Sequence, residues 1–193
     1  KMKHVYRVGL GHRYGREMQL IAGVHFNYSL PETFWPAYQS MLGSEAGAMD
    51  FRSDQYLGMI RNFRRMGWLV LYLFGASPAV CKSFAAAVNL QSLNDTTWYE
   101  PWATSLRMSD LGYSNKSQSR INISLNSLDE YVRDLSNAIG TPDKSYEAIG
   151  VKVDGHYRQL NANLLQIENE YYSPVRPKRV ARSGEQPTAA LRR

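Results

Sequence analysis

The stretch from Met18 to Pro31, MQLIAGVHFNYSLP, constrains the fold most, because its side chains alternate in character with the period of a β-strand. One face of the predicted strand carries Leu20, Ala22, Val24, Phe26, Tyr28 and Leu30. The other face carries Gln19, Ile21, Gly23, His25, Asn27 and Ser29. The pattern predicts a sheet with an apolar core behind one face and a polar site in front of the other.

Gly23 and His25 give the polar face its functional interest. A glycine weakens a strand unless a ligand or another backbone must come close, and histidine is the commonest metal ligand and a proton carrier. The alternative is a solvated outer face with an ordinary surface histidine. This segment alone favours the alternative, because single alternating strands are common in antiparallel sheets.

The composition fits one folded domain or part of a larger one, since 44% of the 193 residues are hydrophobic and 12% are aromatic. The single cysteine, Cys81, excludes an intramolecular disulfide and fits a reducing compartment; we expect it to be a buried structural thiol. The apolar run from Trp68 to Phe74 is far shorter than the ~20 residues of a membrane helix. The chain begins at Lys1 rather than at methionine, so we expect a fragment of a longer product.

A net charge of +6 suits a nucleic-acid binder, and it equally suits an enzyme that handles nucleotides and carboxylates. Basic residues gather near the end of the chain: Arg176, Lys178, Arg179, Arg182, Arg192 and Arg193. No aromatic stacking pattern accompanies them. This tail is therefore either a basic arm or a source of phosphate contacts.

Apolar spacing predicts helices over Glu32–Met41, Phe51–Phe74 and Asn126–Ile139. Glycine and proline between residues 75 and 78 stop the second helix, and we expect a further helix from Ala79, which would complete a helical hairpin. Residues 89–99 are predicted to be a loop. Residues 104–119, rich in hydroxyls and amides, are predicted to be a ligand-binding loop.

A hairpin is predicted around Asp154 and Gly155, with His156 exposed, followed by a second alternating strand over Gln159–Tyr172. That strand would project Gln166, Glu168, Glu170 and Tyr172 to one side. Stacked carboxylates need cations, arginines or water opposite them, so the row indicates either a metal-bearing cleft or a solvated rim. Arg61, Arg64 and Arg65 are predicted to form a solvated, salt-bridged helix face rather than a phosphate site.

Five runs together resemble one family along the whole chain: YRVGLGHRYG, MQLIAGVHFNYSLP, LFGASPAVC, ATSLRMSDLGYSNKSQS and LQIENEYYSPVRPKRVARSGE. They are similar to bacterial glutamate-cysteine ligase of the proteobacterial type. The resemblance implies an α+β fold similar to glutamine synthetase, in which an antiparallel sheet lines a cleft and helices pack behind it. It also implies that residues 1–193 are the central part of one catalytic domain, truncated at both ends.

The resemblance implies ATP-dependent ligation of the glutamate γ-carboxylate to the cysteine amine through an acyl phosphate, the first step of glutathione biosynthesis. The implied cofactor is Mg²⁺ or Mn²⁺, with ATP as co-substrate. The implied protein is a cytoplasmic monomer without nucleic-acid or membrane partners. Because most of the family's acidic metal ligands lie outside residues 1–193, the isolated chain is expected to be inactive.

Residue roles follow from the same resemblance. His25 is implied as a metal ligand and Arg7 as a nucleotide contact. The implied substrate-binding residues are Tyr6, Gln19, Ile21, Arg107, Tyr113 and Tyr172, of which Arg107, Tyr113 and Tyr172 are the implied catalytic residues. A location near the cleft, without a role, is implied for Glu168, Glu170, Arg176, Lys178 and Arg179.

Three alternatives remain open from the sequence. The first is a ligase with the same chemistry and another amine substrate. The second is a basic nucleic-acid-binding fragment without enzymatic activity, favoured by the tail. The third is a scaffold or regulatory fragment that keeps the fold without the chemistry.

Overall fold

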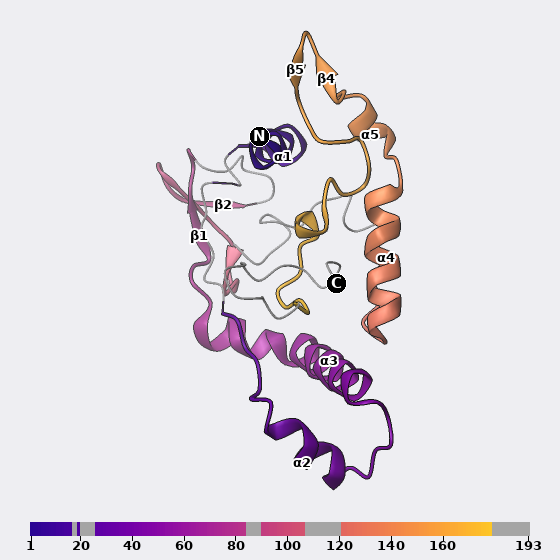
Figure 1. Cartoon of the computed structure of the whole chain (residues 1–193). Helices are drawn as coiled ribbons and strands as arrows, with labels where there is room; N and C mark the ends of the chain where they lie inside the picture. The colour runs from indigo at the N-terminus through magenta and orange to yellow at the C-terminus, as the bar shows by residue number, and fades with distance from the viewer. Residues whose placement is uncertain (17–18, 20–25, 84–89, 107–120, 179–193) are drawn as a thin grey trace.

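The computed structural model describes residues 1–16, 19, 26–83, 90–106 and 121–178. Figure 1 shows the segment that holds η4 running between α4 and the sheet formed by β1, β2 and β3. The elements in chain order are α1 (Met2–Tyr14), α2 (Phe34–Met41), α3 (Ala48–Phe74), β1 (Ala79–Cys81), β2 (Gln91–Asn94), β3 (Thr97–Tyr99), α4 (Leu128–Gly140), α5 (Lys144–Glu147), β4 (Lys152–Val153), β5 (His156–Tyr157) and the 3-10 helix η4 (Glu168–Glu170). This mixture of helices and antiparallel strands confirms the predicted α+β class.

Helix α1 forms from a stretch for which the sequence pattern predicts no element. Its inward side is narrow, with Val5 and Gly9 buried four residues apart. His12 and Arg13 occupy the last turn, where positive charge interacts favourably with the helix dipole. Helix α1 ends at Tyr14 and is capped by Gly15, whose N–H donates to the Gly11 carbonyl over 3.1 Å.

Helices α2 and α3 pack through aromatic rings, and both confirm helical predictions. Trp35 is buried, with its ring centroid 4.8 Å from that of Tyr56 and 6.5 Å from that of Phe51. The Tyr56 hydroxyl accepts a hydrogen bond of 2.8 Å from the Leu30 amide. These contacts attach α2 and the chain before it to the first half of α3 (Figure 1).

The small sheet corrects two predictions. Residues 79–81 form β1 instead of starting a helix, and much of the predicted loop over 89–99 forms β2 and β3, in the antiparallel order β1-β3-β2. The Ser77 hydroxyl accepts from the Ala79 amide over 3.0 Å and so satisfies a backbone donor that a helix start would otherwise leave open. Val80 then pairs with Trp98, two residue types that favour strands.

Cys81 lies at the end of β1, an edge strand, and is exposed, so the prediction of a buried thiol is wrong. Its Sγ atom is 3.0 Å from the Ser83 hydroxyl. Within the described ranges, no helix combines the length and apolar character needed to cross a membrane.

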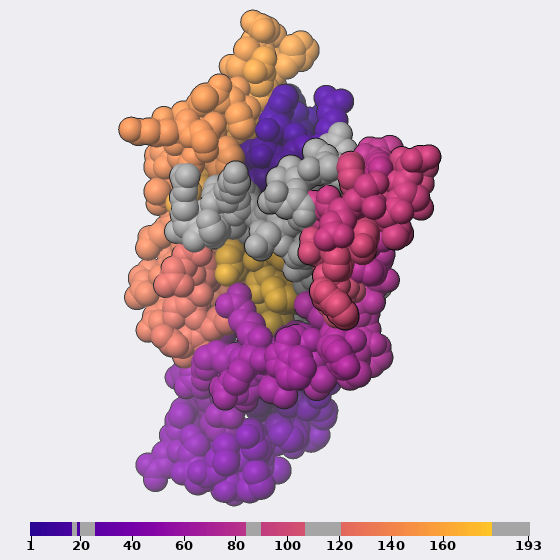
Figure 2. Space-filling model, turned by 180° about the vertical axis from the view of Figure 1, so that it is seen from behind, coloured from indigo at the N-terminus to yellow at the C-terminus, as the bar shows by residue number. Residues whose placement is uncertain are grey.

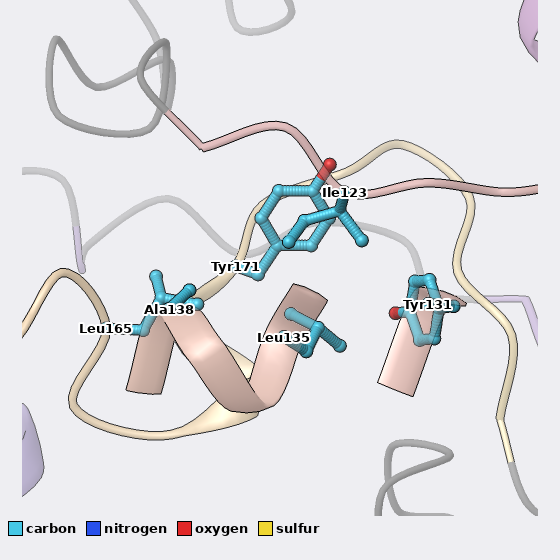
Figure 3. Close-up of a cluster of buried hydrophobic side chains, with 6 residues drawn as sticks. All are labelled: Ile123, Tyr131, Leu135, Ala138, Leu165 and Tyr171. Carbon is cyan, nitrogen blue, oxygen red and sulfur yellow. The ribbon is translucent and has the colours of Figure 1, made fainter. Parts of the chain in front are cut away.

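Helix α4 confirms the amphipathic prediction and builds the main core. The Ser127 hydroxyl caps it by accepting from the Glu130 amide over 3.2 Å. Its apolar stripe packs against residues from before and after it in the chain (Figure 3). The buried cluster consists of Ile123, Tyr131, Leu135, Ala138, Leu165 and Tyr171.

The hairpin of β4 and β5 also confirms its prediction. Asp154 and Gly155 have φ of 50° and 80°, the left-handed values that a tight hairpin turn requires and that glycine adopts without steric cost. Val153 pairs with His156, which is exposed as expected.

The predicted strand over 159–172 is wrong, because side-chain amides compete with strand pairing there. The Asn161 side-chain Nδ2 donates to the Gln166 backbone carbonyl over 3.0 Å, and Gln166 Oε1 accepts from the Leu160 backbone amide over 3.0 Å. The segment is irregular apart from η4 and one isolated bridge between Pro142 and Asn163. Of the predicted strand over 18–31, residues 26–31 carry no strand, and residues 18 and 20–25 lie outside the described residues.

Leu135 tests the α4 core. Its side chain is 0% exposed, so Leu135→Ala leaves a cavity and should lower the free energy of unfolding of the complete gene product by about 2–5 kcal/mol. Ser136→Ala, on the exposed side of the same helix, should change it by less than about 0.5 kcal/mol. Urea unfolding measures both. A loss below about 1 kcal/mol for Leu135→Ala would contradict this core.

Candidate functional site

A buried ion pair joins the last turn of α1 to η4. Arg13 Nη1 and Glu170 Oε1 are 2.9 Å apart, and both side chains are 0% exposed. Taking both charges out of water is costly, and only good geometry with further hydrogen bonds offsets that cost.

Arg13 has those further bonds on every side of its guanidinium. Its Nε donates to Gln159 Oε1 over 2.9 Å, and its Nη2 donates to the Asn161 carbonyl over 2.7 Å. The Tyr146 ring from α5 lies under the guanidinium, with its centroid 3.9 Å from Cζ. Gln159, also 0% exposed, is fixed in turn by donating to the Tyr146 carbonyl over 2.6 Å. Each of the three guanidinium nitrogens therefore donates a hydrogen bond, which holds the cation in one orientation.

Glu170 is held through both carboxylate oxygens. Oε1 accepts from Arg13 and from the Tyr14 hydroxyl, the latter over 2.5 Å, and Oε2 accepts from the Gln166 amide over 2.7 Å. Burial and the adjacent Glu170 carboxylate raise the pKa of Tyr14 far above its ordinary value of 10. The phenol therefore stays protonated and continues to donate to the carboxylate.

Gln166 brings the same segment against the middle of α1. It is buried, and its Nε2 donates to the Tyr6 carbonyl over 3.5 Å. A Cβ at position 9 would collide with Gln166 Oε1, so a larger residue there would displace the end of the Gln166 side chain. Tyr6, Gly9 and Arg13 thus lie along one side of α1, facing residues 159–170.

The outward side of α1 carries a cationic hollow of about 390 Å³. Figure 2 shows α1, in indigo, at the surface of the molecule. The hollow is lined by His4, Arg7, Val8, Gly11, His12, Arg16 and Gln19. Among these lining residues there is no carboxylate, so the hollow has the charge to bind an anion such as a phosphate.

Four of the residues with a predicted catalytic, substrate, nucleotide or metal role lie in the described part of the chain. Arg7 and Gln19 line the same hollow, where Gln19 Nε2 donates to the Arg7 carbonyl over 3.1 Å. Tyr6 is half-buried one residue before Arg7, and Tyr172 is half-buried two residues after Glu170. The structure therefore brings the elements that carry these four residues together. His25, Ile21, Arg107, Tyr113 and Arg179 lie outside the described residues.

Glu170 corrects the prediction of a carboxylate row. The sequence allowed either a metal-bearing cleft or a solvated rim. Glu170 belongs to neither arrangement, because its side chain is buried and paired with Arg13. Glu168 is half-buried in η4. In the described ranges, no group of three His, Cys, Asp or Glu side chains is placed to hold a metal ion.

The basic residues elsewhere bind protein groups. Arg61, Arg64 and Arg65 are exposed, as the predicted solvated face requires. Arg61 Nη1 donates to the Leu125 carbonyl over 2.6 Å, and Arg64 Nη2 donates to the Ser173 hydroxyl over 2.8 Å, so these contacts tie α3 to other segments. Among the described residues, no salt bridge of this face is seen. Arg61 and Arg64 border a second hollow of about 370 Å³ with residues 122–126. Arg176 donates to the Tyr171 carbonyl over 2.8 Å, and Lys178 is exposed.

Sequence reasoning assigned no role to Arg13, Tyr14 and Gln159. The available signal was the spacing of Val5, Gly9 and Arg13, which places all three on one side of a helix. Their partners are 146 to 157 residues away, and no local pattern identifies partners at such separations.

Tyr14 tests the network through pH. Tyr14→Phe removes a hydrogen bond to a charged group and should lower the free energy of unfolding of the complete gene product by about 1.5–3 kcal/mol at pH 7. Because the pKa of Tyr14 is raised on folding, its contribution is fully present below pH ~10, the unfolded value, and declines above it. Burial also raises the pKa of Tyr131, to about 12, which adds to the alkaline decline.

Urea unfolding between pH 7 and pH 11 measures this effect. The alkaline decline should be shallower in Tyr14→Phe than in the wild type by up to ~1.4 kcal/mol per pH unit. Tyr157→Phe, at an exposed tyrosine, should keep the wild-type curve. Equal alkaline slopes for Tyr14→Phe and the wild type would contradict the proposed network.

Known proteins provide a comparison for this arrangement. The family model described as glutamate-cysteine ligase matches residues 1–193. The chain is 57% identical to the glutamate-cysteine ligase of Alcanivorax borkumensis over 198 residues, covering 99% of this chain and 38% of that protein. It is 57% identical to the glutamate-cysteine ligase of Hahella chejuensis over 195 residues, covering 100% of this chain and 37% of that protein.

A solved structure is also similar. The crystal structure of glutamate-cysteine ligase from Francisella tularensis in complex with AMP matches with a TM-score of 0.83 and 40% identity, over 96% of this chain and 36% of that one. The chain thus spans little more than a third of the length of these relatives. Matched along its whole length by the family model, the chain belongs to the glutamate-cysteine ligase family.

Proposed function

We propose that this chain is the central part of one catalytic domain of a glutamate-cysteine ligase, which joins the γ-carboxylate of L-glutamate to the amine of L-cysteine at the expense of ATP. The observation that carries the proposal is the 57% identity, maintained along the whole chain, to proteins of that name. The product would be γ-glutamylcysteine, the first intermediate of glutathione biosynthesis. We propose that the complete protein acts as a cytoplasmic monomer.

The reaction would proceed in two steps. The glutamate γ-carboxylate attacks the γ-phosphorus of ATP, which gives an acyl phosphate and ADP. The cysteine amine then attacks the acyl carbon, the C–N bond forms, phosphate leaves with the C–O electron pair, and the amine loses a proton. Oriented cations on the phosphates and fixed partners for the carboxylates are what this chemistry requires of a protein.

The cationic hollow on α1 supports a nucleotide role for Arg7. Its guanidinium would bind phosphate oxygens, while Gln19, which lines the same hollow, would contact substrate. The AMP in the Francisella tularensis structure supports nucleotide use by this family. The same proposal assigns Tyr6 and Tyr172 to the amino-acid substrates, together with Ile21, Arg107 and Tyr113.

Mg²⁺ or Mn²⁺ is the proposed metal cofactor, and it would neutralise charge on the ATP phosphates. The described residues do not form its site by themselves, since they hold no group of three suitable ligands. We propose His25 as one ligand, with carboxylates supplied from flanking parts of a longer protein.

A phosphate-release assay on the complete gene product tests the function. Release should require ATP, glutamate and cysteine together, and His25→Ala should lower it by about 10- to 100-fold, the range for disturbed metal sites. His156→Ala, at an exposed histidine on β5, should leave it unchanged. Release that depends on a different amine would identify a related ligase. No release from folded protein, with salt-sensitive binding of oligonucleotides, would favour the nucleic-acid alternative.

The 193-residue chain alone gives a separate prediction. We expect no phosphate release above the rate without enzyme, because its described residues lack a metal-ligand group. The same assay measures this, with the complete gene product as positive control. Glutamate-dependent release by the isolated chain would show that residues 1–193 contain a sufficient metal site.

A further inference from the structure

The buried pair of Arg13 and Glu170 links the two parts of the chain that carry the tyrosines proposed to bind substrate. Arg13 follows Tyr6 by seven residues, which is two helical turns, so both lie on the same side of α1. Glu170 precedes Tyr172 by two residues. The ion pair therefore joins the element that carries one tyrosine to the segment that carries the other.

Two further contacts fix this junction. Gln166 bridges it, since its Nε2 donates to the Tyr6 carbonyl and its backbone amide donates to Glu170 Oε2. Tyr171, between Glu170 and Tyr172, is buried in the α4 core, 9% exposed. Tyr172 thus follows two consecutive buried residues, one held by ionic bonds and one by apolar packing, which leaves its backbone little freedom to shift.

The bonds on Glu170 are directional. Its two oxygens accept from a guanidinium and a phenol at the end of α1 and from the backbone amide of Gln166. Charge-assisted bonds of this kind are shorter and stronger than neutral ones, and in a buried site they tolerate little displacement. An apolar contact at this position would hold α1 against the segment without fixing its register.

We propose that Glu170 and Arg13 are positioning residues that hold Tyr6 and Tyr172 at a fixed separation across the amino-acid substrate. The inference rests on the proposed function. Catalytic geometry is sensitive on this scale, because a displacement of ~1 Å by a distant change can cost about 100-fold in rate. Glu170 would act through Tyr172, and its removal would matter only as far as Tyr172 matters.

A double-mutant cycle on the complete gene product tests this dependence. Tyr172→Phe removes one hydroxyl and should raise the KM for cysteine about fivefold in the wild-type background, the typical effect of one hydrogen bond. Glu170→Gln keeps the shape of the side chain and removes its charge. In that background Tyr172→Phe should raise the KM by less than about twofold, because Tyr172 is already displaced.

Glu147→Gln is the matched control, the same substitution at an exposed glutamate of α5. There Tyr172→Phe should keep its full effect. A merely structural role for Glu170 would lower the thermal midpoint and leave the two KM effects to multiply. Multiplicative effects would overturn the positioning role.

If Glu170→Gln does not fold, Tyr14→Phe replaces it in the cycle, since it keeps the ion pair and removes one constraint on Glu170. A reduced effect of Tyr172→Phe on the KM in that background would support the positioning role, and multiplicative effects would overturn it. Wild-type protein with no cysteine-dependent phosphate release would overturn the proposed function and the positioning role together. Activity with multiplicative KM effects would overturn the positioning role alone.

Discussion

The ion pair between Arg13 and Glu170 determines how the two ends of the described chain meet. It joins residues 157 positions apart in a fully buried setting, where each charge would be costly without the other. Each guanidinium nitrogen of Arg13 and both carboxylate oxygens of Glu170 form a hydrogen bond, so the network fixes the orientation of both side chains. The cationic hollow on the outer side of α1 and the backbone before Tyr172 both take their position from it.

Local patterns predicted the elements whose stability is local. The helical spacing over 51–74 and 126–139 was sufficient, as was the turn at Asp154 and Gly155. The predictions failed where side chains form hydrogen bonds with the backbone. Ser77 binds the Ala79 amide and the chain enters β1 instead of a helix, while the amides of Asn161 and Gln166 replace strand pairing over 159–172. The buried residues after Gln159 in that segment come in adjacent pairs, 165–166 and 170–171, which an alternating strand would not bury together.

The residues of the candidate site could be predicted from the sequence. The contacts that fix their positions could not. Resemblance supplied Tyr6, Arg7, Gln19 and Tyr172, and folding places their elements in one region. It did not reveal that Glu170 is a buried partner of Arg13 rather than part of an exposed carboxylate row. A pairing between residues so far apart in the chain depends on tertiary packing, which periodicity cannot report.

The most direct test of this account is the crystal structure of the complete gene product with bound cysteine. We expect Tyr6 and Tyr172 both to contact one cysteine molecule while Arg13 and Glu170 remain paired. A cysteine bound away from one of the two tyrosines, or a broken ion pair in the bound state, would contradict it.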